Sequence, residues 1–103
     1  MSRHREAFEA FAEEAEERLG DSLKKLVLYG SVARGEETEE SDVDVFAVVE
    51  TKEQKHLLQE LGADIGVEHG VIIVPIVKTE DEYEDMEDTI YAREVRETGV
   101  AYV

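Results

Sequence analysis

The sequence contains no cysteine among its 103 residues. A chain without thiols forms no disulfide bond and offers no thiolate to a metal ion. Zinc ribbons, iron–sulfur clusters and cysteine nucleophiles are therefore excluded as the basis of its chemistry.

Long apolar segments are also missing. The longest apolar stretches lie around 43–49 and 71–77, far below the roughly 20 residues needed to cross a bilayer. The first residues are charged, and no apolar segment with a small-residue cleavage site follows them, so no secretory signal is recognised. These features predict a soluble, cytoplasmic protein that does not bind membranes.

Basic residues are scarce. The 11 Lys and Arg stand against 27 Asp and Glu, which gives a formal net charge of −16. Duplex DNA is not an expected partner, because binding to phosphates needs clustered cations. One interpretation is an acidic halophilic protein that stays hydrated in a salt-rich cytoplasm. The alternative is an acidic surface that docks a basic partner, and the acidic run from Glu80 to Asp88 is its best support.

The pattern of apolar residues predicts one mixed α/β (α+β) domain over residues 1–103, with a small sheet of three to four strands. Pro75 indicates an edge strand or a bulge, and Thr79 with Glu82 forms a capping box. In chain order the expected elements are a helix 2–19, a strand 23–29, a glycine-punctuated turn 30–35, a loop 36–41, a strand 43–49, a helix 52–67, a strand 71–77, a short acidic helix from 79, a helical stretch 89–99 and a terminal strand 100–103.

The densest chemical pattern is Gly30 and Ser31 after a strand, followed by Asp42 and Asp44 at the start of the next. Alternate residues of a strand point to the same face, so the two carboxylates project together. Carboxylate oxygens suit Mg²⁺, which commonly shares its other positions with substrate phosphates. Glycine lets the backbone turn sharply and approach a ligand, and serine offers an amide and a hydroxyl to phosphate oxygens. The pattern thus places an anion site beside a cation site.

Other phosphate and metal motifs do not fit. A P-loop needs a lysine and a hydroxyl residue after its last glycine, but Gly35 is followed by two glutamates. A dinucleotide-binding fingerprint needs three glycines, and this segment has two. The three histidines have no metal-ligand spacing, so structural or surface roles are favoured for them.

The segments 28–36 (LYGSVARGE) and 41–45 (SDVDV) together resemble the signature of the minimal nucleotidyltransferases of the DNA polymerase beta superfamily. The resemblance implies the nucleotidyltransferase fold and Mg²⁺-dependent transfer of a nucleoside monophosphate, AMP above all, from a nucleoside triphosphate to an acceptor. It also implies that Gly30 and Ser31 hold the triphosphate and that Asp42 and Asp44 are catalytic metal ligands. Arg34 is expected to add positive charge near the phosphates, as are Lys24 and Lys25.

The sequence departs from the family at one place. The family presents a third carboxylate from a neighbouring strand, whereas the expected strand 71–77 carries no acid, and Pro75 is a candidate for the missing position. Asp64, Glu68 and Glu80 are the nearest alternatives.

Two hypotheses follow from this departure. The first is an active nucleotidyltransferase with an unidentified acceptor, for which a protein is one candidate. The second is a nucleotidyltransferase-fold binding module. Similar proteins are paired with a small helical HEPN-type protein, some as antitoxins that adenylylate their toxin, so the resemblance makes such a protein a candidate partner of this chain.

Overall fold

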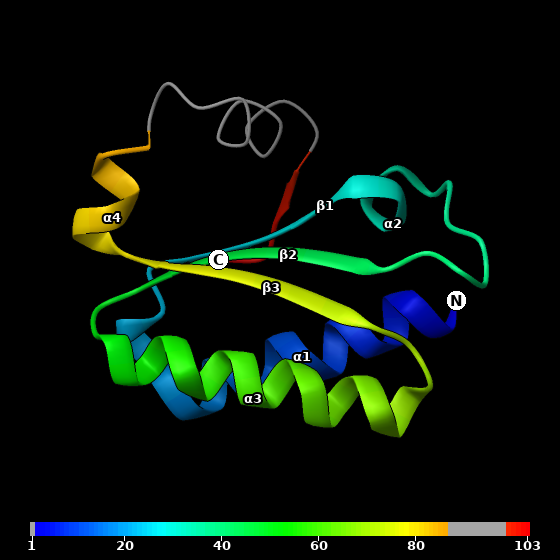
Figure 1. Cartoon of the computed structure of the whole chain (residues 1–103), viewed down its shortest axis with the longest axis horizontal. Coiled ribbons are helices and arrows are strands. Elements are labelled where there is room, and N and C mark those ends of the chain that lie inside the picture. The colour runs from blue at the N-terminus through cyan, green and yellow to red at the C-terminus, as the bar shows by residue number, and fades with distance from the viewer. Residues whose placement is uncertain (1, 87–98) are drawn as a thin grey trace.

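A computed structural model describes residues 2–86 and 99–103 as a four-stranded sheet with two long helices on one face (Figure 1). The described elements, in order, are α1 (Arg3–Leu19), a 3-10 turn (Gly20–Ser22), β1 (Lys25–Tyr29), α2 (Gly30–Arg34), β2 (Val43–Val49), α3 (Lys52–His69), β3 (Ile73–Thr79), α4 (Glu80–Glu84) and β4 (Val100–Ala101). The predicted mixed fold with three to four strands is confirmed. None of the described helices is long and apolar enough to cross a membrane.

The sheet has the strand order β3-β2-β1-β4. β2 pairs antiparallel with β1 and parallel with β3, and α3 makes the connection that a parallel pair requires. In this register Asp44 lies beside Tyr29 on one neighbour and Val74 on the other. β3 is an edge strand, as Pro75 predicted. The strand that carries the two aspartates is therefore flanked on both sides.

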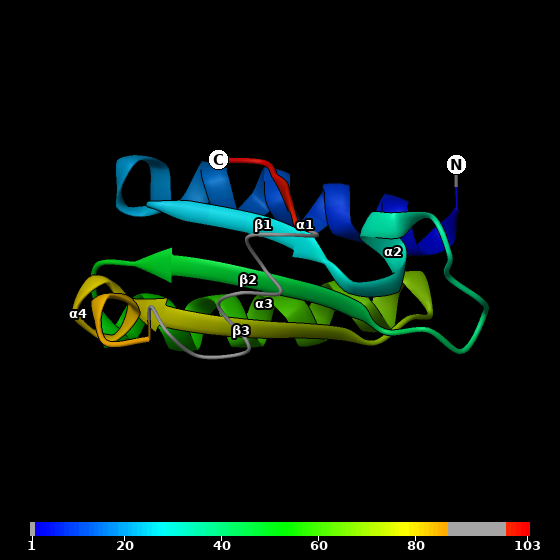
Figure 2. The ribbon, with the colours of Figure 1, turned by 90° about the horizontal axis from the view of Figure 1, so that it is seen from above.

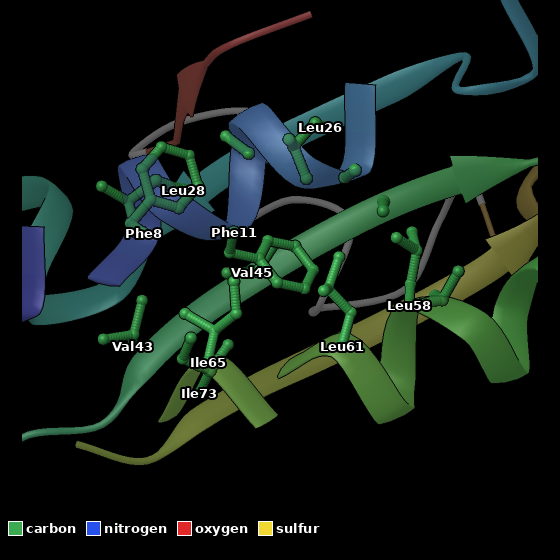
Figure 3. Close-up of a cluster of buried hydrophobic side chains, with 14 of the residues drawn as sticks. Phe8, Phe11, Leu26, Leu28, Val43, Val45, Leu58, Leu61, Ile65 and Ile73 are labelled. Atoms are coloured by element: carbon green, nitrogen blue, oxygen red, sulfur yellow. The ribbon is translucent and has the colours of Figure 1, made fainter. Parts of the chain in front are cut away.

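The two faces of the sheet bury different clusters. Val43 and Val45 face α1 and α3, where they join the main core, whereas Phe46 faces the other way with Tyr29 and Met86. Figure 2 shows α1 beneath the β1 side of the sheet and α3 beneath the β2 and β3 side. Figure 3 shows the core between these layers; its labelled residues are Phe8, Phe11, Leu26, Leu28, Val43, Val45, Leu58, Leu61, Ile65 and Ile73. The face opposite the long helices holds the side chains that are not committed to the main core.

Glycines set how closely α3 approaches β3. A Cβ on Gly66 would stand 2.7 Å from the backbone oxygen of Val71, and one on Gly62 would stand 3.0 Å from the Cγ of Pro75. These glycines lower helix propensity near the end of α3, but they let the helix lie directly on the strand that follows it.

Several boundaries differ from the sequence prediction, among them the ends of α3 (His69 rather than 67), β3 (Thr79 rather than 77) and β4 (Ala101 rather than 103). The expected turn 30–35 is the short helix α2, which Gly35 ends in the left-handed conformation (φ 71°). β1 begins at Lys25 rather than Leu23, because the Leu23 amide bonds back to Gly20 in the 3-10 turn. β3 begins at Ile73, two residues later than expected. The helical stretch predicted over 89–99 lies outside the described residues, apart from its last residue.

Candidate active site

Asp42 and Asp44 lie at the start of β2, on the face that α1 and α3 do not cover. Val43 and Val45 point into the helix-covered core, so the alternation along the strand directs the two aspartates to the opposite face. Asp42 is exposed and Asp44 is half-buried. Asp42 precedes the first residue of β2 and Asp44 is its second residue, so the alternation predicts both carboxylates at the edge of the open face, and their role as metal ligands stays a prediction.

Gly30 lies directly against the carboxylate of Asp44. β1 ends at Tyr29, which pairs with Asp44, and the chain turns at Gly30 with a φ of 75°. A Cβ built on Gly30 would overlap the Oδ2 atom of Asp44. Only glycine therefore satisfies both the left-handed backbone and the close approach. Ser31 follows, half-buried, in the first turn of α2, where N–H groups have no acceptor within the helix.

The first turn of α1 braces the segment that follows this turn. The Arg5 guanidinium donates a hydrogen bond to the carbonyl oxygen of Val32 in α2 at 3.1 Å. The pKa of Glu37 lies below its ordinary value. The largest cause is a hydrogen bond from the backbone of Glu37 itself, followed by one from the Ser2 side chain, and the charges of Arg5 and His4 add to the effect. Sequence analysis missed Arg5 and Glu37, because 27 residues separate Arg5 from Val32 and no local pattern links them.

Arg34 ends α2 and is exposed, with its Nε 3.5 Å from Oε1 of Glu36. Its contribution to phosphate binding stays a prediction. Lys25 lies at the far end of β1, about 16 Å from Gly30 at the rise expected of a strand, and its Nζ stands over the ring of Tyr83. The expectation that Lys24 and Lys25 flank the phosphates is therefore wrong, because β1 carries them away from Gly30.

The position beside Asp44 on β3 is Val74, not Pro75. Pro75 pairs with Val45 and packs toward Gly62 of α3, on the helix-covered face. The suggestion that Pro75 occupies the place of a third carboxylate is thus wrong. Pro75 is one residue away from that position, and adjacent residues of a strand point to opposite faces of the sheet.

None of the three acids named as alternatives reaches Asp44. Asp64 and Glu68 belong to α3, which covers the other face of the sheet. Glu80 follows β3 at its far end, about 20 Å along the strand from Val74. Within residues 2–86 and 99–103, no three acidic or histidine side chains are grouped as a metal site. The described site therefore has two carboxylates.

The donor set and its surroundings fit a hard divalent cation. Both candidate ligands offer oxygen atoms only, which is the preference of Mg²⁺. Two carboxylates cannot complete its coordination, so positions remain for water and for phosphate oxygens. Gly30 keeps the backbone of the turn against Asp44, so a phosphate held by the turn and a cation held by the aspartates would be neighbours.

Comparison with known proteins identifies the family. The family described as "Nucleotidyltransferase domain" matches residues 8–97. Two similar proteins of Methanocaldococcus jannaschii carry the names "Putative protein adenylyltransferase MJ0141" and "Putative protein adenylyltransferase MJ0604". The first is 33% identical over 85 residues, which cover 80% of this chain and 81% of the relative. The second is 34% identical over 77 residues, which cover 75% of each. The chain belongs to the nucleotidyltransferase domain family.

Solved structures share the fold at low sequence identity. A toxin–antitoxin crystallised with AMP-PNP superimposes with a TM-score of 0.64 at 14% identity, over 90% of this chain and 70% of that one. A mutant of the toxin–antitoxin MntA-HpeT gives 0.65 at 16% identity, over 92% and 71%. These matches agree with the nucleotidyltransferase fold and with the resemblance found in the sequence.

Proposed function

We propose that this chain transfers AMP from ATP, in the presence of Mg²⁺, to a hydroxyl group of a protein acceptor. The observation that carries the proposal is the contact of Gly30 with the carboxylate of Asp44, which leaves no room for a side chain between the turn and the acid. Membership of the nucleotidyltransferase family supports the reaction class. The names of the two archaeal relatives favour a protein acceptor.

Each residue has a defined task in the proposed reaction. Gly30 and Ser31 hold the triphosphate, and Asp42 and Asp44 hold Mg²⁺. The cation supplies neutralisation of the charge that develops on the transferred phosphoryl group. The acceptor oxygen forms a bond to the α-phosphorus while the bond from that phosphorus to the bridging oxygen breaks. Pyrophosphate leaves, and the hydroxyl proton passes to water.

A second candidate function is a binding module that neutralises a partner without chemistry. The observation that favours it is Val74 in register with Asp44, where a third acid would share the face of the first two. The partner in this case is a small helical protein of the HEPN type, which the resemblance of the sequence suggests. The toxin–antitoxin complexes among the similar folds support a toxin as the partner.

One experiment separates the two functions. The protein encoded next to this gene is incubated with the chain, Mg²⁺ and ATP labelled at the α-phosphate, and the sample is analysed for both label transfer and complex formation. The test variant is Asp42→Asn with Asp44→Asn. The control, Glu9→Gln with Glu13→Gln, removes the same two charges from exposed positions of α1.

The outcomes are distinct. Label on the partner with the wild type and the control, but not with the Asp42→Asn/Asp44→Asn variant, supports the transferase. A stable complex that all variants form without label supports the binding module. Absence of both complex and label, together with no binding of Mg²⁺ and ATP, contradicts both functions.

A further inference from the structure

A hollow of about 450 Å³ opens beside Asp42. On one side it is lined by the acidic loop that precedes β2, and on the other by the end of α3 and the turn into β3. Its lining residues are Glu39, Glu40, Ser41, Asp42, Gly66, Val67, Gly70, Val71 and Ile72. Figure 1 shows the loop before β2 and the turn between α3 and β3 at the same end of the molecule. Asp42 therefore belongs both to the candidate active site and to this hollow.

The lining of the hollow is apolar along the end of α3 and the turn into β3. Val67 is 84% exposed and Ile72 is 64% exposed, the highest values among the large apolar residues that the structure describes. A single exposed apolar residue is ordinary, but apolar residues gathered in one concave place mark a binding surface. Val71, half-buried, lies between them in the same lining.

The hollow lies where an acceptor has to approach. Gly30 and Ser31, which would hold the leaving pyrophosphate, stand at the end of β1, on one side of β2. In phosphoryl transfer the attacking and leaving oxygens are roughly in line. With the α-phosphate beside Asp42 and Asp44 and the pyrophosphate on the β1 side, the acceptor hydroxyl would come from the β3 side of β2. Ile72 stands there, and its carbonyl oxygen accepts a hydrogen bond from the Val43 amide at 2.8 Å.

The rim of the hollow selects the charge of its occupant. Glu39, Glu40 and Asp42 are exposed and give the rim three carboxylates. Arg3 brings one cation against a lining residue, because its guanidinium lies 3.5 Å from the position of a Cβ on Gly70, so the rim stays acidic on balance. A nucleic acid acceptor would bring phosphates against these carboxylates, which disfavours it. A polypeptide with basic side chains would be attracted.

We propose that this hollow is the acceptor-docking surface of the enzyme. Its occupant is a protein segment that inserts an apolar side chain against Val67 and Ile72 and places basic side chains beside Glu39 and Glu40. The hydroxyl to be modified then lies next to Asp42. This inference rests on the proposed transferase function. It specifies that the acceptor approaches from the β3 side of β2 and that it is a protein segment with apolar and basic side chains.

The test follows backbone amide NMR shifts of the chain loaded with Mg²⁺ and ATP. The probe is a short peptide in which a central tyrosine is flanked by leucine and arginine, and a matched peptide replaces arginine with glutamate. A short single-stranded RNA tests the other acceptor class. The basic peptide is expected to shift the amides of 39–42 and 66–72, and the acidic peptide and the RNA are expected to leave them unchanged.

Two variants on α3 make the test specific. Val67→Lys is expected to weaken binding of the basic peptide about tenfold, because it removes an apolar contact and adds repulsion. Gln59→Lys adds the same charge at an exposed position of α3 outside the hollow. The affinity of this variant for the basic peptide is expected to stay within about twofold of the wild-type value.

Shifts at Gly30 and Ser31 on addition of Mg²⁺ and ATP are read separately, because they report the nucleotide. If they appear while the basic peptide shifts residues elsewhere, shifts none, or binds Val67→Lys as well as wild type, the docking surface is wrong and the transferase stands. Shifts of the hollow by RNA also overturn the inference. If Gly30 and Ser31 do not respond to the nucleotide, the proposed function itself fails.

Discussion

Gly30 and Asp44 are the residues on which the site depends most directly. Two independent reasons require glycine at position 30. Its φ is positive, and the Asp44 carboxylate occupies the space that a side chain would need. Gly35 has a similar φ, but a Cβ there would meet nothing within 4 Å. A side chain at Gly35 would therefore meet only backbone strain, whereas a side chain at Gly30 would meet both backbone strain and the Asp44 carboxylate.

Replacing each glycine with alanine tests this distinction. Gly30→Ala is expected to abolish binding of Mg²⁺ and ATP and to lower the free energy of unfolding by about 1–3 kcal/mol, since a strained backbone is joined by a clash with Asp44. Gly35→Ala carries only the cost of the left-handed conformation, about 1–2 kcal/mol, and should still bind the nucleotide. Urea denaturation and ATP titration measure both quantities. Nucleotide binding by Gly30→Ala at wild-type affinity would contradict the assigned site.

At the scale of helices and strands, the sequence predicted the elements whose boundaries are marked by neighbouring residues in the chain. The helix α1 was predicted closely, because its apolar residues repeat every three or four positions and Ser2 caps it through a hydrogen bond to the Arg5 amide. β2 was predicted with its correct bounds, because a run of valines lies between polar segments. Both helix and strand carry their own boundary signals.

Other features depend on contacts between distant segments. Nothing in 71–77 distinguishes Val71 from Ile73 as the start of β3, since only pairing with β2 decides it. The same register decides that Val74, rather than Pro75, neighbours Asp44. The two aspartates and Gly30 could be found from the sequence, whereas the brace from Arg5 and the hollow beside Asp42 required the tertiary structure.

The approach of α3 to β3 leads to a prediction about Gly66. Alanine normally stabilises a helix relative to glycine by about 1 kcal/mol. Gly66→Ala is nevertheless expected to lower the free energy of unfolding by about 1–3 kcal/mol, because the new Cβ would stand 2.7 Å from the Val71 oxygen. Gln59→Ala, on the exposed side of α3, is the control and should change stability by less than about 0.5 kcal/mol. Urea denaturation gives the values, and a more stable Gly66→Ala would contradict the close packing.

The start of α4 gives a prediction about pH. The Glu82 carboxylate accepts hydrogen bonds from the Thr79 amide and from Lys55 Nζ, each at 2.9 Å, and these partners lower its pKa from 4.5 to about 2. Its contribution to stability is therefore complete above pH 4.5 and lost as the pH falls toward 2.

The Glu82→Gln variant isolates this contribution. It should melt below wild type at neutral pH, with the difference narrowing steadily once the pH drops under 4.5. Thermal melts followed by circular dichroism measure it. Lys52→Gln, which changes one charge of an exposed lysine in the first turn of α3, should keep a constant difference from wild type. A Glu82→Gln difference that does not depend on pH would show that the carboxylate is not held in its charged form.

At the scale of the whole molecule, the excess of acid is the dominant property. The net charge is −16, and acids crowd the exposed side of α1 closely enough to affect a neighbour. The pKa of Tyr102 is raised, first by desolvation and then by Glu16, Glu13 and Glu9. Such self-repulsion destabilises the compact state until salt screens it.

Stability is therefore expected to rise with salt. Increasing KCl from about 0.1 M to about 1 M shortens the Debye length from roughly 10 Å to roughly 3 Å and should raise the melting temperature. A variant with glutamine at the exposed positions Glu9, Glu13, Glu16 and Glu17 should show a smaller rise. A melting temperature that falls or stays constant in wild type would contradict the interpretation of the net charge as an adaptation to salt.

The central claim is that Gly30, Ser31, Asp42 and Asp44 form one site for a metal-bound nucleoside triphosphate. The most direct measurement is a titration of Mg²⁺ and ATP followed by backbone amide NMR shifts, in wild type and in Asp42→Asn with Asp44→Asn. The site predicts shifts at these four residues that require Mg²⁺ and vanish in the double variant while the rest of the spectrum stays folded. Unchanged nucleotide binding by the folded double variant, or shifts confined to other parts of the chain, would contradict it.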